Sequence, residues 1–256
     1  MKFSANLGFL WNDLPLPDAI RAAKAAGFDA VECHWPYDVA APIVAEVLAE
    51  TGLTMLGLNT RRGNVVAGDN GLSAIPGREE EARAAIDEAI LYARTIGTPN
   101  IHVMAGRATG DAARDTFIKA LKYACDQARP LNINILIEPL NKYDAPDYFL
   151  TTTCQALGLI KDVHCANLKL MFDCYHVQLM EGDLSHRLEG LLPHIGHIQF
   201  ASVPDRGTPD HGEVNYSQIF EVIRKLNYNA PLGAEYRPRG RTDESLSWLK
   251  ASRLLK

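Results

Sequence analysis

The chain has 256 residues, of which 47% are hydrophobic and 22% are charged. This composition is ordinary for a folded protein and argues against long disordered or fibrous segments. The formal net charge of −5 offers no overall basic field for a phosphate backbone, which disfavours a nucleic-acid-binding protein.

The cysteines and the apolar segments favour a cytoplasmic protein. No apolar run approaches the roughly 18 residues that a membrane span needs, and the first residues lack the pattern of a signal peptide. The five cysteines are widely spaced without a CxxC pair, which is typical of reduced cytosolic cysteines. We therefore expect no membrane and no nucleic acid as partner, and we leave a homo-oligomer open.

Short apolar runs alternate with longer segments of helical periodicity along the chain. The runs predict strands at 2–7, 28–32, 53–59, 100–105, 133–138, 167–173, 194–201 and 231–236. The other segments predict helices at 18–26, 42–50, 78–96, 111–129, 152–163, 184–192, 216–226 and 243–254. Strict alternation of this kind implies parallel strands joined by right-handed crossovers.

Eight such units predict an α/β fold with one domain over residues 1–256, a single (β/α)₈ TIM barrel. The rival architecture is an open doubly wound sheet, which usually carries a glycine-rich phosphate loop after its first strand. That place here reads Leu7-Gly8-Phe9-Leu10-Trp11-Asn12 and lacks the fingerprint. We therefore expect no organic cofactor.

Polar side chains lie at the carboxyl ends of the predicted strands, where barrels carry their chemistry. Four of them end consecutive strands, the fifth to the eighth: Glu138, Asp173, Gln199 and Glu235. A residue of this kind taken alone is more often a helix cap or a solvated loop residue. Three carboxylates gathered on one rim, however, repel one another unless a positive group lies between them. Oxygen ligands favour Mg²⁺ or Mn²⁺, so the pattern predicts a divalent-metal site.

Two further residues on this rim are candidates for substrate contacts. His176 follows Asp173 by three residues and would donate to a substrate oxygen, or else cap the next helix. Arg206, in the loop after the seventh strand, suits a substrate carboxylate or phosphate, although a solvated arginine fits the pattern as well. The candidates for lining the pocket are weaker, because a packed core or loop explains them too: Glu32, Tyr37, His102 and Arg61.

Short motifs spread over nearly the whole chain carry a family resemblance. They are Phe3-Ser4-Ala5-Asn6-Leu7, Pro36-Tyr37-Asp38, Ile75-Pro76-Gly77-Arg78-Glu79, Leu136-Ile137-Glu138-Pro139-Leu140-Asn141, Phe172-Asp173-Cys174-Tyr175-His176, Gly196-His197-Ile198-Gln199, Gly212-Glu213-Val214-Asn215-Tyr216 and Glu235-Tyr236-Arg237-Pro238. Together they resemble the hydroxypyruvate isomerase family of the xylose isomerase-like, AP endonuclease-like barrels. The resemblance implies a metal held by the four strand-end residues, proton transfer by Glu138 and Glu235, and substrate contacts from His176 and Arg206.

The reaction that the resemblance implies is the interconversion of hydroxypyruvate and tartronate semialdehyde through an enediolate stabilised by the metal. The substrate would be a small anionic oxo or hydroxy acid. The chain departs from typical members at 59–64, which reads Asn-Thr-Arg-Arg-Gly-Asn, and at His34-Trp35, where apolar residues are commoner.

The sister 2-oxo-tetronate isomerases share two other segments with this chain, His102-Val103-Met104-Ala105-Gly106 and Pro204-Asp205-Arg206. A 2-oxo-tetronate isomerase, or a related sugar-acid isomerase or epimerase, is therefore the alternative. An AP-endonuclease-like DNA repair enzyme is disfavoured, because it would need several histidine ligands for zinc and a basic face.

Overall fold

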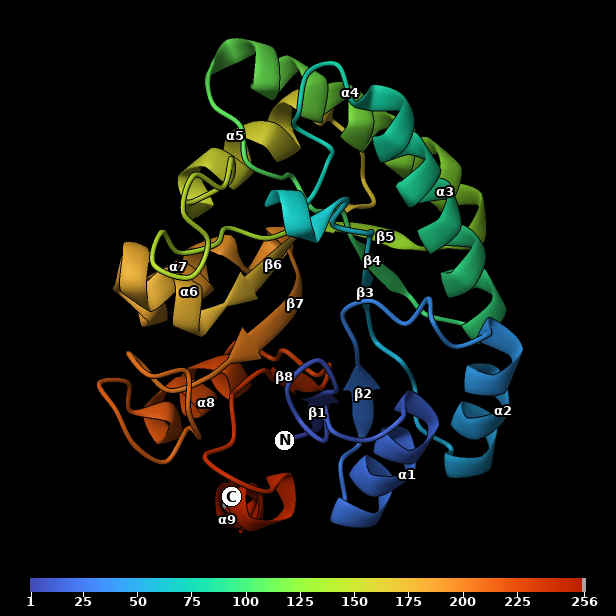
Figure 1. Cartoon of the computed structure of the whole chain (residues 1–256). Coiled ribbons are helices and arrows are strands. Elements are labelled where there is room, and N and C mark those ends of the chain that lie inside the picture. Colours follow the sequence, from blue (N-terminus) through green and yellow to red (C-terminus); the bar gives the residue numbers. More distant parts are fainter. Residues whose placement is uncertain (255–256) are drawn as a thin grey trace.

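In the computed structural model, which describes residues 1–254, parallel strands form a barrel surrounded by helices (Figure 1). The strands are β1 (Phe3–Asn6), β2 (Ala30–Glu32), β3 (Leu58–Asn59), β4 (Asn100–His102), β5 (Asn134–Ile137), β6 (Leu168–Asp173), β7 (Ile195–Phe200) and β8 (Leu232–Ala234). Their hydrogen-bonded order is β2-β1-β8-β7-β6-β5-β4-β3. The predicted (β/α)₈ barrel is confirmed.

The ring closes between β2 and the segment that leads into β3. Val31 N donates to Thr54 O at 3.0 Å, and Leu56 N donates to Val31 O at 2.7 Å. The predicted strand at 53–59 is thus paired, although only its last two residues are regular. Because the strands are parallel around the ring, their carboxyl ends meet on one rim.

The helices are α1 (Leu16–Ala26), α2 (Ala41–Thr51), α3 (Glu79–Ile96), α4 (Gly110–Ala128), α5 (Thr153–Val163), α6 (Cys174–Met180), α7 (Leu184–Leu191), α8 (Tyr216–Lys225) and α9 (Ser247–Leu254). Short 3₁₀ turns are η1 (Val65–Ala67), η2 (Arg129–Leu131), η3 (Leu192–His194) and η4 (Thr242–Ser245). The last predicted helix begins later than expected because η4 forms its first residues. Within residues 1–254, no helix is long and apolar enough to cross a membrane.

Helix α6 is absent from the sequence-based expectations and matters for the site. It begins directly after β6, where the side chain of Asp173 accepts a hydrogen bond from Tyr175 N at 2.9 Å. A side-chain oxygen at this position satisfies one of the free N–H groups at a helix start. His176 therefore lies in the first turn of a helix rather than in a loop.

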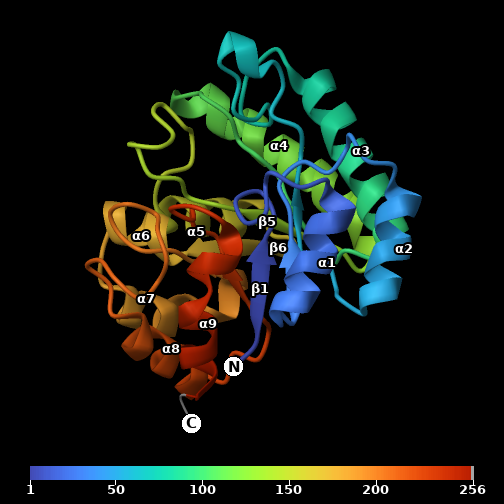
Figure 2. The same ribbon diagram turned by 60° about the horizontal axis from the view of Figure 1, so that its bottom comes forward.

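One end of the barrel is built up by connecting segments. Figure 2 shows the segment with η1 after β3 and the loop after β5 rising above the carboxyl ends of the strands. Aromatic rings pack edge to face between the strands and α9. The ring centroid of Phe3 on β1 lies 5.9 Å from that of Phe200 on β7 and 5.3 Å from that of Trp248 in α9. The rigid apolar layer fixes the strand ends and therefore the polar side chains that they carry.

Candidate active site

Glu138 follows β5 directly and is buried in an acidic setting. Its Oε1 atom has no hydrogen-bond partner among the described residues, and its Oε2 atom lies 3.5 Å from His102 Nδ1. Burial raises the pKa of Glu138 well above its ordinary value, and the nearby Glu235 and Asp173 carboxylates raise it further. Glu138 is therefore a carboxyl group that holds a proton more tightly than a carboxyl group in water.

Glu235 follows β8 and has the opposite environment. Its Oε1 atom accepts a hydrogen bond from Asn6 Nδ2 at 2.9 Å and lies 2.8 Å from His34 Nε2. Its Oε2 atom lies 2.8 Å from Arg206 Nη2. Burial alone would raise the pKa of Glu235, but Arg206 and His34 outweigh burial and hold it below its usual range. Glu235 therefore remains a carboxylate.

Asp173 has two roles at the end of β6. Its Oδ1 atom caps α6, and its Oδ2 atom lies 3.4 Å from Arg206 Nη2 and 3.6 Å from His176 Nε2. Burial raises the pKa of Asp173 to about 8, although Arg206 acts in the other direction. The Asp173 side chain thus contacts both the start of α6 and the side chains of Arg206 and His176.

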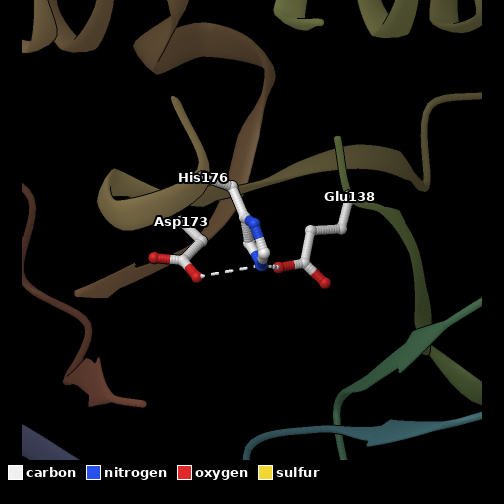
Figure 3. Close-up of side chains that lie close together, drawn as sticks. All are labelled: Glu138, Asp173 and His176. Carbon is white, nitrogen blue, oxygen red and sulfur yellow. Dashed lines mark ion pairs between the residues drawn. The ribbon is translucent and has the colours of Figure 1, made fainter. Parts of the chain in front are cut away.

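One ring nitrogen of His176 faces the carboxyl groups of Glu138 and Asp173, and the other faces the backbone of Asn141. Its Nδ1 atom accepts a hydrogen bond from the main-chain N–H of Asn141 at 3.1 Å. A backbone N–H can only donate, so the neutral ring carries its proton on Nε2. That nitrogen lies 3.8 Å from Glu138 Oε1 and faces Asp173, as Figure 3 shows. Burial lowers the pKa of His176 to about 3, so the ring is a neutral N–H donor.

Arg206 supplies the positive charge between the carboxylates. Beside its contacts with Glu235 and Asp173, its Nη1 atom lies 3.5 Å from Asp144 Oδ2. The side chain is buried, and burial alone would lower its pKa, but the surrounding carboxylates raise it above the ordinary value. The sequence predicts a cation among these acids, and the protein itself contributes one.

Gln199 is oriented by a buried network at the centre of the barrel. Its Nε2 atom donates to Glu32 Oε2 at 3.4 Å, and His197 Nε2 lies 2.6 Å from the same oxygen. Gly233 on β8 leaves room for the side chains of Glu32 and Gln199, because a Cβ atom at this position would overlap Glu32 Oε1 and lie 2.8 Å from Gln199 Cγ. The Oε1 atom of Gln199 has no partner among the described residues and is left as a buried acceptor.

A cavity of about 20 Å³, room for one or two water-sized groups, lies at the carboxyl ends of the strands. Its polar lining residues are Asn6, Glu32, His34, Asn59, His102, Glu138, His197, Gln199 and Glu235. Glu32 and His102 are thus in the pocket, as the sequence suggests. Tyr37 and Arg61 lie outside it: Tyr37 donates its hydroxyl to Asn59 O, and Arg61 pairs with Glu88.

The residues present fit a hard divalent cation. Glu138, Asp173 and His176 offer ligand atoms that all lie within 4.8 Å of one another. Glu138 and Gln199 each leave a buried oxygen acceptor without a donor among residues 1–254, an arrangement that is costly unless a ligand completes it. The proton on His176 Nε2 makes that ring a hydrogen-bond donor, so the carboxylate oxygens of Glu138 and Asp173 are the atoms of this group that remain for a cation.

Sequence reasoning missed two neighbours of Glu235. Asn6 ends β1 and His34 follows β2, and both reach Glu235 because β8 and β2 flank β1. Asn6 is one of the polar strand ends, which is the only local signal that pointed to it. His34 had none beyond its place in a segment that departs from the family pattern.

Comparison with known proteins shows the family of the chain. Residues 20–252 match the xylose isomerase-like TIM barrel family. A 2-oxo-tetronate isomerase from Cupriavidus necator is 44% identical over 253 residues, and a hydroxypyruvate isomerase from Escherichia coli is 39% identical over 253 residues. The matches cover 97% of this chain and 97% and 98% of the two relatives.

Among solved structures, the crystal structure of an AP endonuclease, family 2, from Brucella melitensis superposes with a TM-score of 0.94 at 40% identity, over 98% of each chain. The family match and the two isomerases at about 40% identity cover nearly the whole chain. The chain therefore belongs to the xylose isomerase-like TIM barrel family, in the group that holds the hydroxypyruvate and 2-oxo-tetronate isomerases.

Proposed function

We propose that the chain isomerises a short sugar acid, with 2-oxo-tetronate as the first substrate and hydroxypyruvate as the second. The sequence motifs put hydroxypyruvate first. The relatives named 2-oxo-tetronate isomerase at 44% and 43% identity favour the alternative over the hydroxypyruvate isomerase at 39%. The observation that carries the reaction type is the contrast between two buried glutamates on one cavity, Glu138 without a donor on Oε1 and Glu235 with three partners.

In this reaction a carbonyl and a hydroxyl group exchange places between adjacent carbons. For 2-oxo-tetronate, a proton leaves C3 and a proton is added at C2, while the hydroxyl proton passes from O3 to O2. Atoms balance without an oxidant or an organic cofactor. The barrier lies in the negative charge that develops on the two oxygens of the enediolate. A divalent cation held by Glu138, Asp173, Gln199 and Glu235 would supply Lewis-acid stabilisation of that charge.

Glu138 is proposed to move the carbon-bound proton. A general base needs an accessible lone pair and sufficient basicity: Glu138 Oε1 has no partner among the described residues, and burial raises the pKa of Glu138 above its ordinary value. Glu235 is less suited to this task, because Arg206 and His34 lower its pKa and a less basic carboxylate accepts a carbon-bound proton less readily. When two carboxyl groups of one site have pKa values shifted in opposite directions, their roles differ as well. We therefore assign both carbon proton transfers to Glu138 and a charge-holding role to Glu235.

His176 and Arg206 would orient the substrate. The neutral ring of His176 offers its Nε2 proton to a substrate oxygen, because Asn141 fixes the tautomer. Arg206 is the positive charge among Glu235, Asp173 and Asp144 that a substrate carboxylate would meet. It would therefore determine which end of the acid faces β7. Both roles follow from atoms that already point into the site.

An activity panel tests the proposal. Protein stripped with a chelator is incubated with 2-oxo-tetronate or hydroxypyruvate, with and without added Mg²⁺ or Mn²⁺, and the products are followed by NMR. We expect 3-oxo-tetronate and tartronate semialdehyde only in the samples with metal, with faster turnover of the four-carbon acid. Failure to convert either acid with either metal would refute the proposed function.

A further inference from the structure

His102 is a buried residue of the cavity for which the proposed chemistry has no use. It ends β4, is 2% exposed and lines the same cavity as Glu138, Gln199 and Glu235. Neither nitrogen of its ring has a hydrogen-bond partner among residues 1–254. The nearest carboxylate oxygen, Glu138 Oε2, lies 3.5 Å from Nδ1, which is too long for a good hydrogen bond.

The other buried histidines of the site are held by the protein. His176 accepts a hydrogen bond from the main-chain N–H of Asn141, and His197 lies 2.6 Å from Glu32 Oε2. Leaving a buried polar group unpaired is costly, so native proteins rarely keep one without a partner. The unpaired ring of His102, facing a polar cavity, indicates that a ligand supplies its partner.

The position of His102 indicates which part of a ligand it meets. Arg206 enters the site from the loop after β7 and contacts Glu235 after β8 and Asp173 on β6. His102 enters from β4 and stands beside Glu138, which follows β5. A sugar acid whose carboxylate faces Arg206 therefore has its far end on the side of His102.

We infer that His102 donates a hydrogen bond to the C4 hydroxyl group of a four-carbon acid and thereby selects 2-oxo-tetronate over hydroxypyruvate. This inference rests on the proposed function. Hydroxypyruvate has no fourth carbon and would leave the buried donor unpaired, which is how a polar pocket discriminates against a shorter analogue.

Kinetics of two His102 variants test the inference on the metal-loaded enzyme. His102→Leu removes both ring nitrogens at similar volume and should lower kcat/KM for 2-oxo-tetronate about 10- to 100-fold, with less than about a 3-fold effect on hydroxypyruvate. His102→Gln keeps a donor and should recover part of the loss. His197→Leu is the matched control, since it removes a buried histidine that already has a partner and should lower both activities alike.

Binding of acids that cannot react separates this inference from the proposed function. Calorimetry with Mn²⁺-loaded protein should show tighter binding of erythronate than of glycerate, and His102→Leu should abolish the difference while Mn²⁺ affinity is unchanged. An equal kinetic loss on both acids, an unchanged binding preference or a loss of Mn²⁺ affinity would overturn the role of His102. A wild-type protein that prefers erythronate yet converts neither oxo acid would instead refute the isomerase and support the binding role.

Discussion

The Nη2 atom of Arg206 lies 2.8 Å from the Oε2 atom of Glu235, and both side chains are buried. Removing one partner of a buried ion pair leaves an uncompensated charge, which typically costs about 3–5 kcal/mol. We expect Arg206→Ala to lower the free energy of unfolding by about that amount in chelator and to raise KM for both acids. Urea denaturation and steady-state kinetics measure the two effects.

Matched variants make the Arg206 prediction specific. Arg206→Lys keeps the charge but loses the planar guanidinium, so it should recover only part of both losses. Arg61→Ala removes an exposed pair with Glu88 and should change stability by less than about 1 kcal/mol. An Arg206→Ala protein as stable as the wild type, with KM unchanged, would show that Arg206 neither stabilises the fold nor contributes to substrate binding.

Asp173 allows the helix cap to be separated from the metal site. Asn caps a helix about as well as Asp, so Asp173→Asn should keep α6 and the melting temperature while it weakens Mn²⁺ binding at least 10-fold. Asp173→Ala should lose the cap as well, at about 1 kcal/mol. Calorimetric titration with Mn²⁺ and thermal melts distinguish the two. Wild-type Mn²⁺ affinity in Asp173→Asn would remove Asp173 from the metal site.

Metal binding should release protons. Burial raises the pKa of Asp173 to about 8, so the metal-free site holds a proton on this residue at pH 7. A cation must displace that proton, and Mn²⁺ affinity should therefore rise with pH between about 6 and 8. Titrations in buffers of different ionisation enthalpy should show on the order of one proton released at pH 7. A binding enthalpy independent of buffer, with affinity independent of pH, would contradict these protonation states.

The fold could be predicted well because its signals are local. Each strand and helix unit carries its own periodicity, so the order of the elements follows from the sequence alone. Helix α6 was missed because Cys174–Met180 is short and apolar and directly continues the run of β6. Its start depends on the side-chain cap from Asp173, which no periodicity reveals.

The site residues that could be predicted from the sequence lie at the strand ends or in the segments that follow them. Glu138 and Gln199 line one cavity, as their strand positions suggest. The contacts of Asn6 and His34 with Glu235 depend on how β1, β2 and β8 are arranged in the ring, which is a tertiary property. The burial of Arg206 among carboxylates depends on the conformation of its loop. The backbone at Arg206 has φ 54°, a left-handed conformation that cannot be predicted from the residue type.

The assignment of the carbon proton to Glu138 is the centre of this account, and hydrogen exchange with solvent tests it most directly. Wild-type protein, Glu138→Gln and, as a control, the exposed Glu213→Gln are incubated with 2-oxo-tetronate and Mg²⁺ in D₂O, and deuterium at C3 and C2 is followed by NMR. The account predicts deuterium incorporation and isomerisation by the wild type and by Glu213→Gln, and a loss of about 10²–10⁴-fold in both rates in a folded Glu138→Gln. Incorporation by Glu138→Gln at more than about half the wild-type rate would contradict it.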